Sequence, residues 1–257
     1  MTRTLLFLYF PYPIIGTGDT RALKAVLFDL FGTLITAESD DNAHRALSEK
    51  LAHIHDYAFT GEEHFKLYYE LVHGKRSKEK LTSSKAVWEA LRELSVKYGF
   101  KLKIDYPGVR KLHLMFHIAY AEPYPDAIQA LEKARRLCGR VGLVSDADND
   151  MAYGILYKLK FLQYLDTVVT SEEVGVNKPN PKIFLIAAER LGVRPENTAM
   201  IGDSWKDIEG SKKAGMKAVL VLRRREVLNN LTVEPDAIVE NLLQAVNKVV
   251  ELLDCRG

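Results

Sequence analysis

An alternation of short apolar runs with single helical segments, broken by one very long connection, constrains the fold of this chain most. The apolar runs are residues 25–28, 141–144, 167–169, 199–201 and 218–222. The helical patterns between them are residues 125–137, 151–159, 181–191 and 205–214. Strands that alternate with single helices predict an α/β fold built on an open, doubly wound parallel sheet. Ligands of such sheets collect at the carboxyl ends of the strands.

The long connection separates the first two apolar runs. A crossover between parallel strands needs only a dozen or so residues, and residues 37–122 greatly exceed that length. Two helical stripes occur within them, Leu47, Leu51, Ile54 and Ala58 in the first and Val87, Ala90, Leu91 and Leu94 in the second. We therefore expect a small inserted helical domain at 37–122, an α/β core formed by 21–36 and 123–257, and an N-terminal extension at 1–20.

The composition excludes several classes of protein. With 47% hydrophobic and 27% charged residues the chain is ordinary for a globular protein, and its net charge of +2 indicates neither a nucleic-acid nor a membrane partner. The early apolar stretch at 5–10 is far shorter than the ~20 residues of a membrane span, and no cleavage pattern of a secretion signal follows it. Cys138 and Cys255 are too few for a disulfide framework, so we expect a reducing, cytoplasmic location.

Two apparent metal motifs are better explained without a metal. His113 and His117 are spaced i, i+4 in the inserted segment, but no third ligand lies at a recognisable spacing, so a solvated or packed helix face is the better interpretation. Asp146, Asp148 and Asp150 begin a calcium-loop pattern, yet the glycine and glutamate positions that such a loop requires hold other residues. Acidic residues in the first turn of a helix that starts near Asp150 explain them.

Four short segments at or just after strand termini carry the chemistry. They are residues 29–34 (DLFGTL), 144–146 (VSD), 177–179 (NKP) and 201–207 (IGDSWKD). In this order and spacing they resemble the four motifs of the haloacid dehalogenase superfamily of hydrolases, and the resemblance covers the chain from about residue 21 to its C-terminus. It implies a Rossmann-like α/β core with a helical cap inserted after the first motif, where residues 37–122 lie. It also implies a hydrolase that forms a covalent intermediate on an aspartate.

The resemblance assigns a catalytic role to residues in three of these segments. Asp29 would be the nucleophile, because a carboxylate is ionised at neutral pH and needs no base to activate it. Gly32 permits the tight turn after the strand, and Thr33 offers a hydroxyl to anchor the loop or a transferred group. Ser145 is suited to donate a hydrogen bond to a phosphate oxygen, and Lys178 would offset the repulsion between an anionic nucleophile and an anionic substrate.

The cofactor that the resemblance implies is Mg²⁺, an ion that prefers oxygen ligands. We expect Asp29, Asp203 and the backbone carbonyl of Phe31 to hold it, with Asp207 as a further ligand or directly behind the ligands. The residues expected to contact substrate are Phe31, Gly32, Ser145, Asp146 and Lys178. We expect a small-molecule substrate and leave the oligomeric state open.

Phe31 departs from the pattern of the superfamily's phosphatases. They usually carry a second aspartate at this position, the acid that protonates the leaving alcohol. Phenylalanine cannot do so, and because a positioned acid is worth about 10²- to 10⁴-fold in rate, we expect slow hydrolysis of alkyl phosphates and a preference for aryl or acyl phosphates. Haloacid dehalogenases also lack this aspartate, so cleavage of a 2-haloacid through an aspartyl ester, without metal, is the alternative function.

The fourth segment favours the phosphatase over the dehalogenase. Dehalogenases of this family replace the first metal-binding carboxylate by a small polar residue, whereas Asp203 and Asp207 are both present here. Clustered carboxylates repel one another unless a cation neutralises them, so their retention indicates a metal. The arginine that binds the substrate carboxylate in dehalogenases has only Arg45 as a candidate counterpart. A third hypothesis is a binding protein that has lost catalysis.

Overall fold

The sheet is parallel throughout and six-stranded in the part of the chain that the computed structural model describes, residues 23–72 and 82–255. The strands are β1 (Lys24–Phe28), β2 (Gly139–Ser145), β3 (Thr167–Thr170), β4 (Thr198–Gly202), β5 (Lys217–Val221) and β6 (Ala237–Val239). Their order in the sheet is β3-β2-β1-β4-β5-β6. This arrangement confirms the predicted α/β fold, and the first five strands coincide with the predicted apolar runs. The predicted extension at 1–20 lies outside the described residues.

Strand β6 was missed at the sequence level. It is only three residues long, lies at an edge of the sheet, and has Ile238 about half exposed. Its residues, Ala237, Ile238 and Val239, are all apolar, but the run is shorter than the four to eight residues typical of a strand and lies between Asp236 and Glu240. So short a run was not distinguished from a loop.

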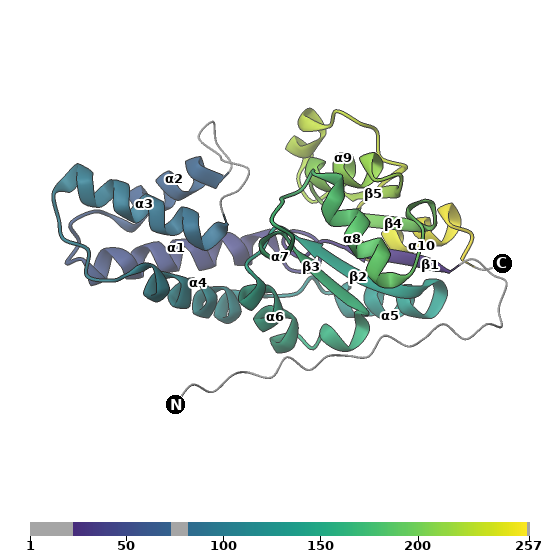
Figure 1. Cartoon of the computed structure of the whole chain (residues 1–257), viewed down its shortest axis with the longest axis horizontal. Coiled ribbons are helices and arrows are strands. Elements are labelled where there is room, and N and C mark those ends of the chain that lie inside the picture. The colour runs from purple at the N-terminus through teal and green to yellow at the C-terminus, as the bar shows by residue number, and fades with distance from the viewer. Residues whose placement is uncertain (1–22, 73–81, 256–257) are drawn as a thin grey trace.

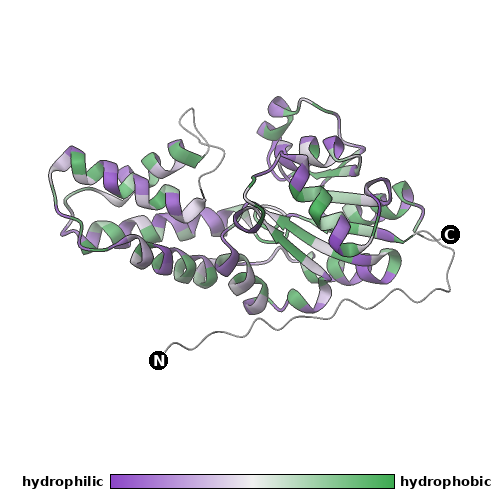
Figure 2. Ribbon diagram, viewed as in Figure 1, coloured by the Kyte–Doolittle hydropathy of each residue, from purple (hydrophilic) through white to green (hydrophobic). Residues whose placement is uncertain are grey.

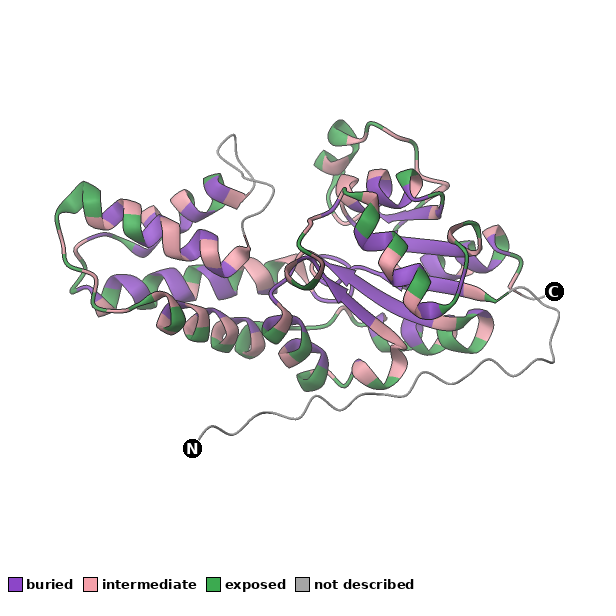
Figure 3. Ribbon diagram, in the orientation of Figure 1, coloured by how far each residue is buried: buried purple, intermediate pink, exposed green. Residues whose placement is uncertain are grey.

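Helices cover both faces of the sheet (Figure 1). They are α5 (Ala127–Cys138), α6 (Asn149–Lys158), α7 (Ser171–Val174), α8 (Pro181–Leu191), α9 (Trp205–Lys213) and α10 (Leu242–Leu252). Short 3-10 helices occupy Leu162–Tyr164, Pro195–Asn197 and Arg225–Asn230. In β1, Val26 and Phe28 belong to the cluster with α5, α6 and α10, whereas Ala25 and Leu27 pack with α8. Figure 3 shows the strands almost entirely buried, as two covered faces require.

The sequence specifies the ends of α8 locally. The side chain of Asn180 accepts a hydrogen bond from the backbone N–H of Lys182, and Pro181 occupies the first turn, where a missing N–H costs nothing. Gly192 ends the helix with φ of 66°, a left-handed conformation that glycine adopts without a Cβ penalty. Such terminal signals, together with the amphipathic pattern visible along the helices in Figure 2, explain why the helix positions could be predicted.

The described residues of the long connection, 37–72 and 82–122, form four helices, which we call the helical insertion. They are α1 (Ala37–Ile54), α2 (Gly61–Val72), α3 (Ser83–Tyr98) and α4 (Tyr106–Tyr120). The insertion extends from one end of the α/β core in Figure 1 and has its own apolar cluster, in which Leu47 and Leu51 meet Val87 and Leu91. Ala58 of the first predicted stripe lies beyond the end of α1, because that helix stops at Ile54.

The insertion contacts the α/β core through α4. Arg110 of α4 donates hydrogen bonds to Glu172 at 2.6 and 3.0 Å and to Asp150 at 3.1 Å. Lys158 of α6 donates to backbone carbonyls at the end of α4, among them Ile118 at 2.6 Å and Ala121 at 3.0 Å. These polar contacts fix the position of α4 against the edge of the core that carries β2 and β3.

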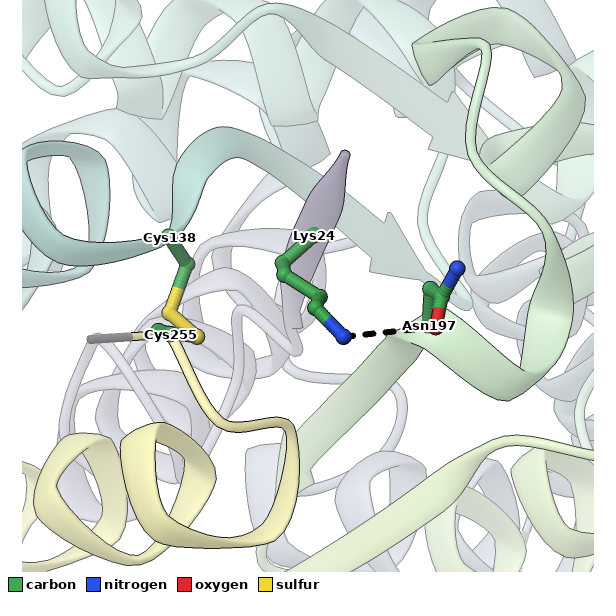
Figure 4. Close-up of a disulfide and its surroundings, with 4 residues drawn as sticks. All are labelled: Lys24, Cys138, Asn197 and Cys255. Atoms are coloured by element: carbon green, nitrogen blue, oxygen red, sulfur yellow. Dashed lines mark hydrogen bonds between the residues drawn. A yellow bond between two sulfur atoms is a disulfide. The ribbon is translucent and has the colours of Figure 1, made fainter. Parts of the chain in front are cut away.

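A disulfide joins the last residue of α5, Cys138, to Cys255 after α10 (Figure 4). The two Cα atoms are 5.2 Å apart, although the residues are 117 positions apart in sequence. Beside it, Lys24 donates a hydrogen bond to Asn197. The expectation drawn from the low cysteine count is therefore wrong as regards disulfides, and that count gives no information on the compartment. None of the described helices is both long and apolar enough to cross a bilayer.

Candidate active site

The four chemistry-bearing segments meet at the carboxyl edge of the sheet. Asp29 follows β1, which lies between β2 and β4, so that Ser145 at the end of β2 and Asp203 after β4 flank it on either side. The backbone N–H of Asp29 donates to the carbonyl of Ile201 at 3.0 Å, and this bond holds Asp29 at the edge of the sheet. The Asp29 side chain is buried, with 5% of the residue exposed.

Lys178 is the centre of the charge network. Its Nζ donates to Asp29 Oδ1 at 2.7 Å and to Asp207 Oδ1 at 2.6 Å, and its side chain is only 4% exposed. Its backbone N–H donates to Asp146 Oδ1 at 2.9 Å. The lysine is therefore bonded to residues of the first, second and fourth segments at once.

Three carboxylates gather around this lysine. Asp29, Asp203 and Asp207 each offer one oxygen within 4.8 Å of the others. Thr33 Oγ1 donates to Asp203 Oδ1 at 3.1 Å, and Asp207 accepts from the backbone N–H of Ser204 at 3.1 Å in the capping box that begins α9. These bonds orient the two carboxylates of the fourth segment.

Gly32 is required by this packing as well as by the turn. Its φ is +78°, and a Cβ built there would lie 2.2 Å from Asp203 Oδ2. A side chain at this position would therefore collide with a carboxylate of the cluster in addition to straining the backbone. The glycine lets the loop after β1 lie directly against the loop after β4.

The electrostatics of the cluster show an excess of negative charge. Burial raises the pKa of Asp29 well above its usual value, Lys178 opposes this, and Asp207 and Asp203 add to it. Burial, followed by repulsion from Asp207, raises the pKa of Asp203 to about 6. Burial by itself would lower the pKa of Lys178, but the surrounding carboxylates outweigh it and raise that pKa, so the lysine stays charged.

This donor set fits a hard divalent cation. Three carboxylates share one lysine, which leaves net negative charge in a buried place, and a divalent ion would neutralise it. Carboxylate oxygens are the ligands that such ions prefer. The role of the Phe31 carbonyl as a ligand stays a prediction, as do the roles of the other site residues.

Ser145 supplies a second indication of a ligand. Its Oγ is fully buried and forms no hydrogen bond within residues 23–72 and 82–255. A buried hydroxyl without a partner costs free energy unless a bound group satisfies it. The position of Ser145 beside Asp29 suits a hydrogen bond to an anionic substrate. Asp146 is held by the backbone of Lys178, and burial raises its pKa against the opposing effect of that lysine.

Arg45, the candidate for a dehalogenase carboxylate-binding arginine, is engaged elsewhere. Its side chain is 51% exposed, it forms an ion pair with Glu62 at 2.6 Å, and its guanidinium lies 4.1 Å from the ring centre of Phe65. These partners belong to α2, on the surface of the helical insertion. The suggestion that Arg45 binds a substrate carboxylate stays a prediction, and in this structure the guanidinium pairs with Glu62 instead.

The interpretation of the His113 and His117 pair also requires correction. Both side chains are buried, so a packed helix face is confirmed. A third potential ligand nevertheless exists: His44 of α1 lies with them, and the three rings each offer a nitrogen within 4.8 Å of the others. Sequence spacing did not show it, because α1 and α4 are brought together only by the packing of the insertion.

The acidic triplet after β2 behaves as predicted. Asp148 occupies the N-cap position of α6, and Asp150 lies in the first turn of that helix, where it pairs with Arg110. Carboxylates near a helix N-terminus are favoured by the helix dipole. Asp148 and Asp150 thus belong to the helix start, whereas Asp146 accepts a hydrogen bond from the backbone of Lys178.

Comparison with known proteins gives consistent matches. The family model of haloacid dehalogenase-like hydrolases matches residues 23–215. The glyceraldehyde 3-phosphate phosphatase of Methanothermobacter thermautotrophicus is 28% identical over 90% of this chain and all of that protein. The phosphoglycolate phosphatase of Aquifex aeolicus is 30% identical over 78% of this chain and 85% of that protein.

Solved structures also match over most of the chain. The crystal structure of a phosphatase from Thermococcus onnurineus is 27% identical, with a TM-score of 0.65, and the match covers 88% of this chain and 98% of that one. The L-2-haloacid dehalogenase of Xanthobacter autotrophicus has the same TM-score, 0.65, at 21% identity, covering 89% of this chain and 99% of that one. The latter likeness shows the fold alone.

Proposed function

We propose that this chain, which belongs to the haloacid dehalogenase-like hydrolases, is a magnesium-dependent phosphatase that forms an aspartyl-phosphate intermediate on Asp29. The observation that carries the proposal is the bridge from Lys178 Nζ to Asp29 at 2.7 Å and to Asp207 at 2.6 Å, with Asp203 in the same cluster. A dehalogenase that works without metal has no need of so many buried carboxylates.

The chain's own residues account for the binding of a phosphate. Ser145 Oγ, buried and without a hydrogen-bond partner in the described chain, donates to a phosphoryl oxygen. Lys178 brings a positive charge beside the nucleophile and lowers the cost of placing a second anion there. Bound between Asp29, Asp203 and Asp207, Mg²⁺ would withdraw negative charge from the phosphoryl oxygens.

The chemistry proceeds in two displacements at phosphorus. A carboxylate oxygen of Asp29 forms a bond to phosphorus, and the bond from phosphorus to the leaving oxygen breaks, with its electron pair staying on that oxygen. Water then attacks the phosphorus of the aspartyl phosphate, which releases inorganic phosphate and restores the carboxylate. Thr33 donates a hydrogen bond to Asp203 at 3.1 Å and so holds the loop after β1 against the metal-binding carboxylates during both steps.

Phe31 sets the class of substrate. Its side chain packs against the main apolar cluster of the core and offers no proton to a leaving oxygen. Leaving groups that are stable as anions, such as aryl and acyl phosphates, therefore react faster than alkyl phosphates. The names of the relatives in Methanothermobacter and Aquifex, both phosphatases of small phosphorylated compounds, support a small phosphorylated substrate.

We further propose that residues 37–122 act as a cap over this edge of the sheet. The insertion is joined to the core by two segments that run side by side, with Thr36 N–H donating to the Glu122 carbonyl at 2.9 Å. The contacts of Arg110 with Glu172 and Asp150 hold it in the position seen here. A cap of this kind excludes water and supplies specificity contacts.

A comparison of leaving groups and metals tests the phosphatase proposal. The purified chain is assayed with p-nitrophenyl phosphate and with an alkyl phosphate such as glycerol phosphate, first with Mg²⁺ and then with a chelator. We expect hydrolysis that depends on Mg²⁺ and favours the aryl ester by about 10²-fold or more. Equal rates for the two esters, or rates indifferent to the chelator, contradict the proposal.

Phe31 is also the observation that favours the second candidate, a 2-haloacid dehalogenase. A halide leaves without a proton, so phenylalanine would be no handicap. This candidate requires release of halide from 2-chloropropionate by metal-free enzyme. Its absence at high enzyme concentration, together with phosphatase activity in the first assay, eliminates it.

A further inference from the structure

Three histidines lie together inside the helical insertion. His44 comes from α1 and His113 and His117 from α4, and each is 3% exposed or less. Each ring offers a nitrogen within 4.8 Å of the others. We propose that this cluster, with Asp40, is a second metal site, which binds a divalent transition metal such as Zn²⁺. The proposal does not depend on the phosphatase activity proposed for the core.

The spacing of three donor atoms matches a zinc site. His117 Nε2 is 3.1 Å from His44 Nε2 and 3.1 Å from Asp40 Oδ1, and His44 Nε2 is 3.7 Å from the same oxygen. Tetrahedral Zn²⁺ with bonds of about 2.0–2.1 Å to nitrogen and oxygen separates neighbouring ligand atoms by about 3.4 Å. The triangle formed by these three atoms therefore needs little adjustment to become one face of a tetrahedral site.

The hydrogen bonding of His117 leaves the correct nitrogen available. Its Nδ1 is 2.8 Å from the carbonyl of His113, an acceptor only, so Nδ1 carries the hydrogen and donates it. Nε2 then faces the Asp40 carboxylate oxygen at 3.1 Å, where it can either share a proton with that oxygen or bind a cation together with it. Metal-bound histidines characteristically donate their other N–H to a carbonyl in this way.

The groups around the cluster can accommodate the ion. Tyr68 Oη, 2.7 Å from His44 Nε2, is also 3.2 Å from Ser83 Oγ, so its hydrogen can turn to the serine when a metal occupies the imidazole nitrogen. His113, whose Nε2 is 3.1 Å from Ser83 Oγ, is the nearest further ligand. Asp148 is buried, and one of its carboxylate oxygens lies 3.8 Å from His113 Nδ1. Neither oxygen meets the distance and angle criteria of a hydrogen bond to any of the described residues.

This site differs in chemistry from the carboxylate cluster of the core. Imidazole ligands suit zinc, copper or nickel, whereas carboxylate ligands suit magnesium. Phe31, two residues after Asp29 in the chain, has its ring centre 6.2 Å from that of His117 in an edge-on contact. A metal on His44 and His117 would tie α1 to α4 at the place where the insertion contacts Phe31.

Metal titration of the full chain tests the proposal. The protein is stripped with a chelator, supplied with excess Mg²⁺, and titrated with Zn²⁺ by calorimetry and with Co²⁺ by visible spectroscopy. We expect one equivalent of Zn²⁺, the intense visible bands of tetrahedral cobalt, and a rise in melting temperature when Zn²⁺ is present. Absence of Zn²⁺ binding overturns the proposal and leaves the cluster as a hydrogen-bonded network that shares a proton.

Variants locate the binding. His117→Gln and Asp40→Asn are each expected to weaken Zn²⁺ binding by about tenfold or more, and Asp40, 29% exposed, can be changed with little risk to folding. His53→Gln, at an exposed histidine of the same helix α1, is the matched control and keeps the affinity. Zn²⁺ affinity that is unchanged in Asp40→Asn and folded His117→Gln, or that is lost instead in Asp203→Asn, places the ion elsewhere and overturns the proposal.

Discussion

The carboxylate cluster of the α/β core and the histidine cluster of the helical insertion are built in opposite ways. In each, three ligand-type side chains come within 4.8 Å. Asp29 and Asp203 reach their positions because they follow adjacent parallel strands, whose carboxyl ends always meet at one edge of the sheet. His44 and His117, 73 positions apart, meet only because α1 packs on α4.

The two clusters also differ in how their charge is balanced. The core cluster contains its own counterion, Lys178, which bonds Asp29 and Asp207 directly. The histidine cluster contains no lysine or arginine among the residues given above: three imidazole rings lie beside the carboxylates of Asp40 and Asp148. Carboxylates can be buried close together when a lysine among them offsets their repulsion. Imidazoles, which carry no negative charge, can be buried together at a lower electrostatic cost than carboxylates.

Removal of the nucleophile should give the largest effect, a loss of activity in the core with no change in metal binding by the insertion. Asp29→Asn is expected to lower phosphatase activity by about a thousandfold or more, because an amide cannot form the covalent intermediate. Mass spectrometry of trapped enzyme should show the adduct on the parent and none on the variant. Zn²⁺ binding at the histidine cluster should be unchanged. A variant that keeps turnover would contradict the assignment of Asp29.

Phe31, two residues after Asp29 and in ring contact with His117, offers a gain of function. Phe31→Asp introduces a carboxyl group at the position where a leaving-group acid is missing, and we expect alkyl phosphate hydrolysis to rise by about 10- to 100-fold. Aryl phosphate hydrolysis should change much less, because its leaving group needs no proton. Phe31→Leu is the control and should give no gain. If both esters accelerate equally, the missing acid is not what limits the alkyl substrate.

The disulfide should stabilise the core and leave the insertion unaffected. Cys138→Ser is expected to cost about 2–4 kcal/mol of unfolding free energy and to lower the melting temperature by roughly 5–15 °C, since a closed loop of 117 positions is released. Cys255→Ser should give the same loss, and the double variant no more. Calorimetry with and without a reductant measures the effect, and a parent protein indifferent to reductant would refute it.

The ion pair between Arg110 of the insertion and Glu172 of the core should have the smallest effect on stability. The hydrogen bond from Arg110 lowers the pKa of Glu172, against an opposing effect of burial. A lowered folded-state pKa contributes stability that is present above the unfolded value of about 4.3 and is lost as the pH falls through the folded value. Glu172→Gln should therefore cost about 0.5–1 kcal/mol at pH 7, since the pair is partly exposed.

The matched control for this pair is the adjacent Glu173, which pairs with Arg190 wholly within the core and is more exposed. Glu173→Gln should cost less than Glu172→Gln at pH 7. Denaturant unfolding at several pH values measures both. The difference between the parent and Glu172→Gln should shrink below about pH 4, and a constant or growing difference would show that the ion pair is not its cause.

Several features of the fold and the site were predictable because their causes are local. Residues 25–28 are apolar throughout since β1 is covered on both faces, and Pro181 and Gly192 mark the ends of α8. Asp29 and Lys178 were identified from short segments that follow strands. The sequence predicted that Lys178 would bring a positive charge to the nucleophile. It did not predict that Nζ would bond both Asp29 and Asp207.

Other features depend on contacts that no local pattern encodes. Cys138 and Cys255 pair because α5 and α10 pack on the same face of the sheet. Arg45 was a plausible substrate ligand in sequence, yet it pairs with Glu62 on the surface of the insertion. The β6 strand was missed because its apolar run is only three residues long and lies between two acidic residues.

By itself the sequence determined the α/β class, the place of the insertion and the residues at the sheet edge, because strand periodicity and the rule that parallel strands end together turn order along the chain into position in space. The tertiary structure decided the disulfide, the surroundings of Phe31 and the meeting of His44 with His113 and His117. Helix packing and long-range closure depend on the shapes of whole surfaces, and those shapes exist only once the chain has folded.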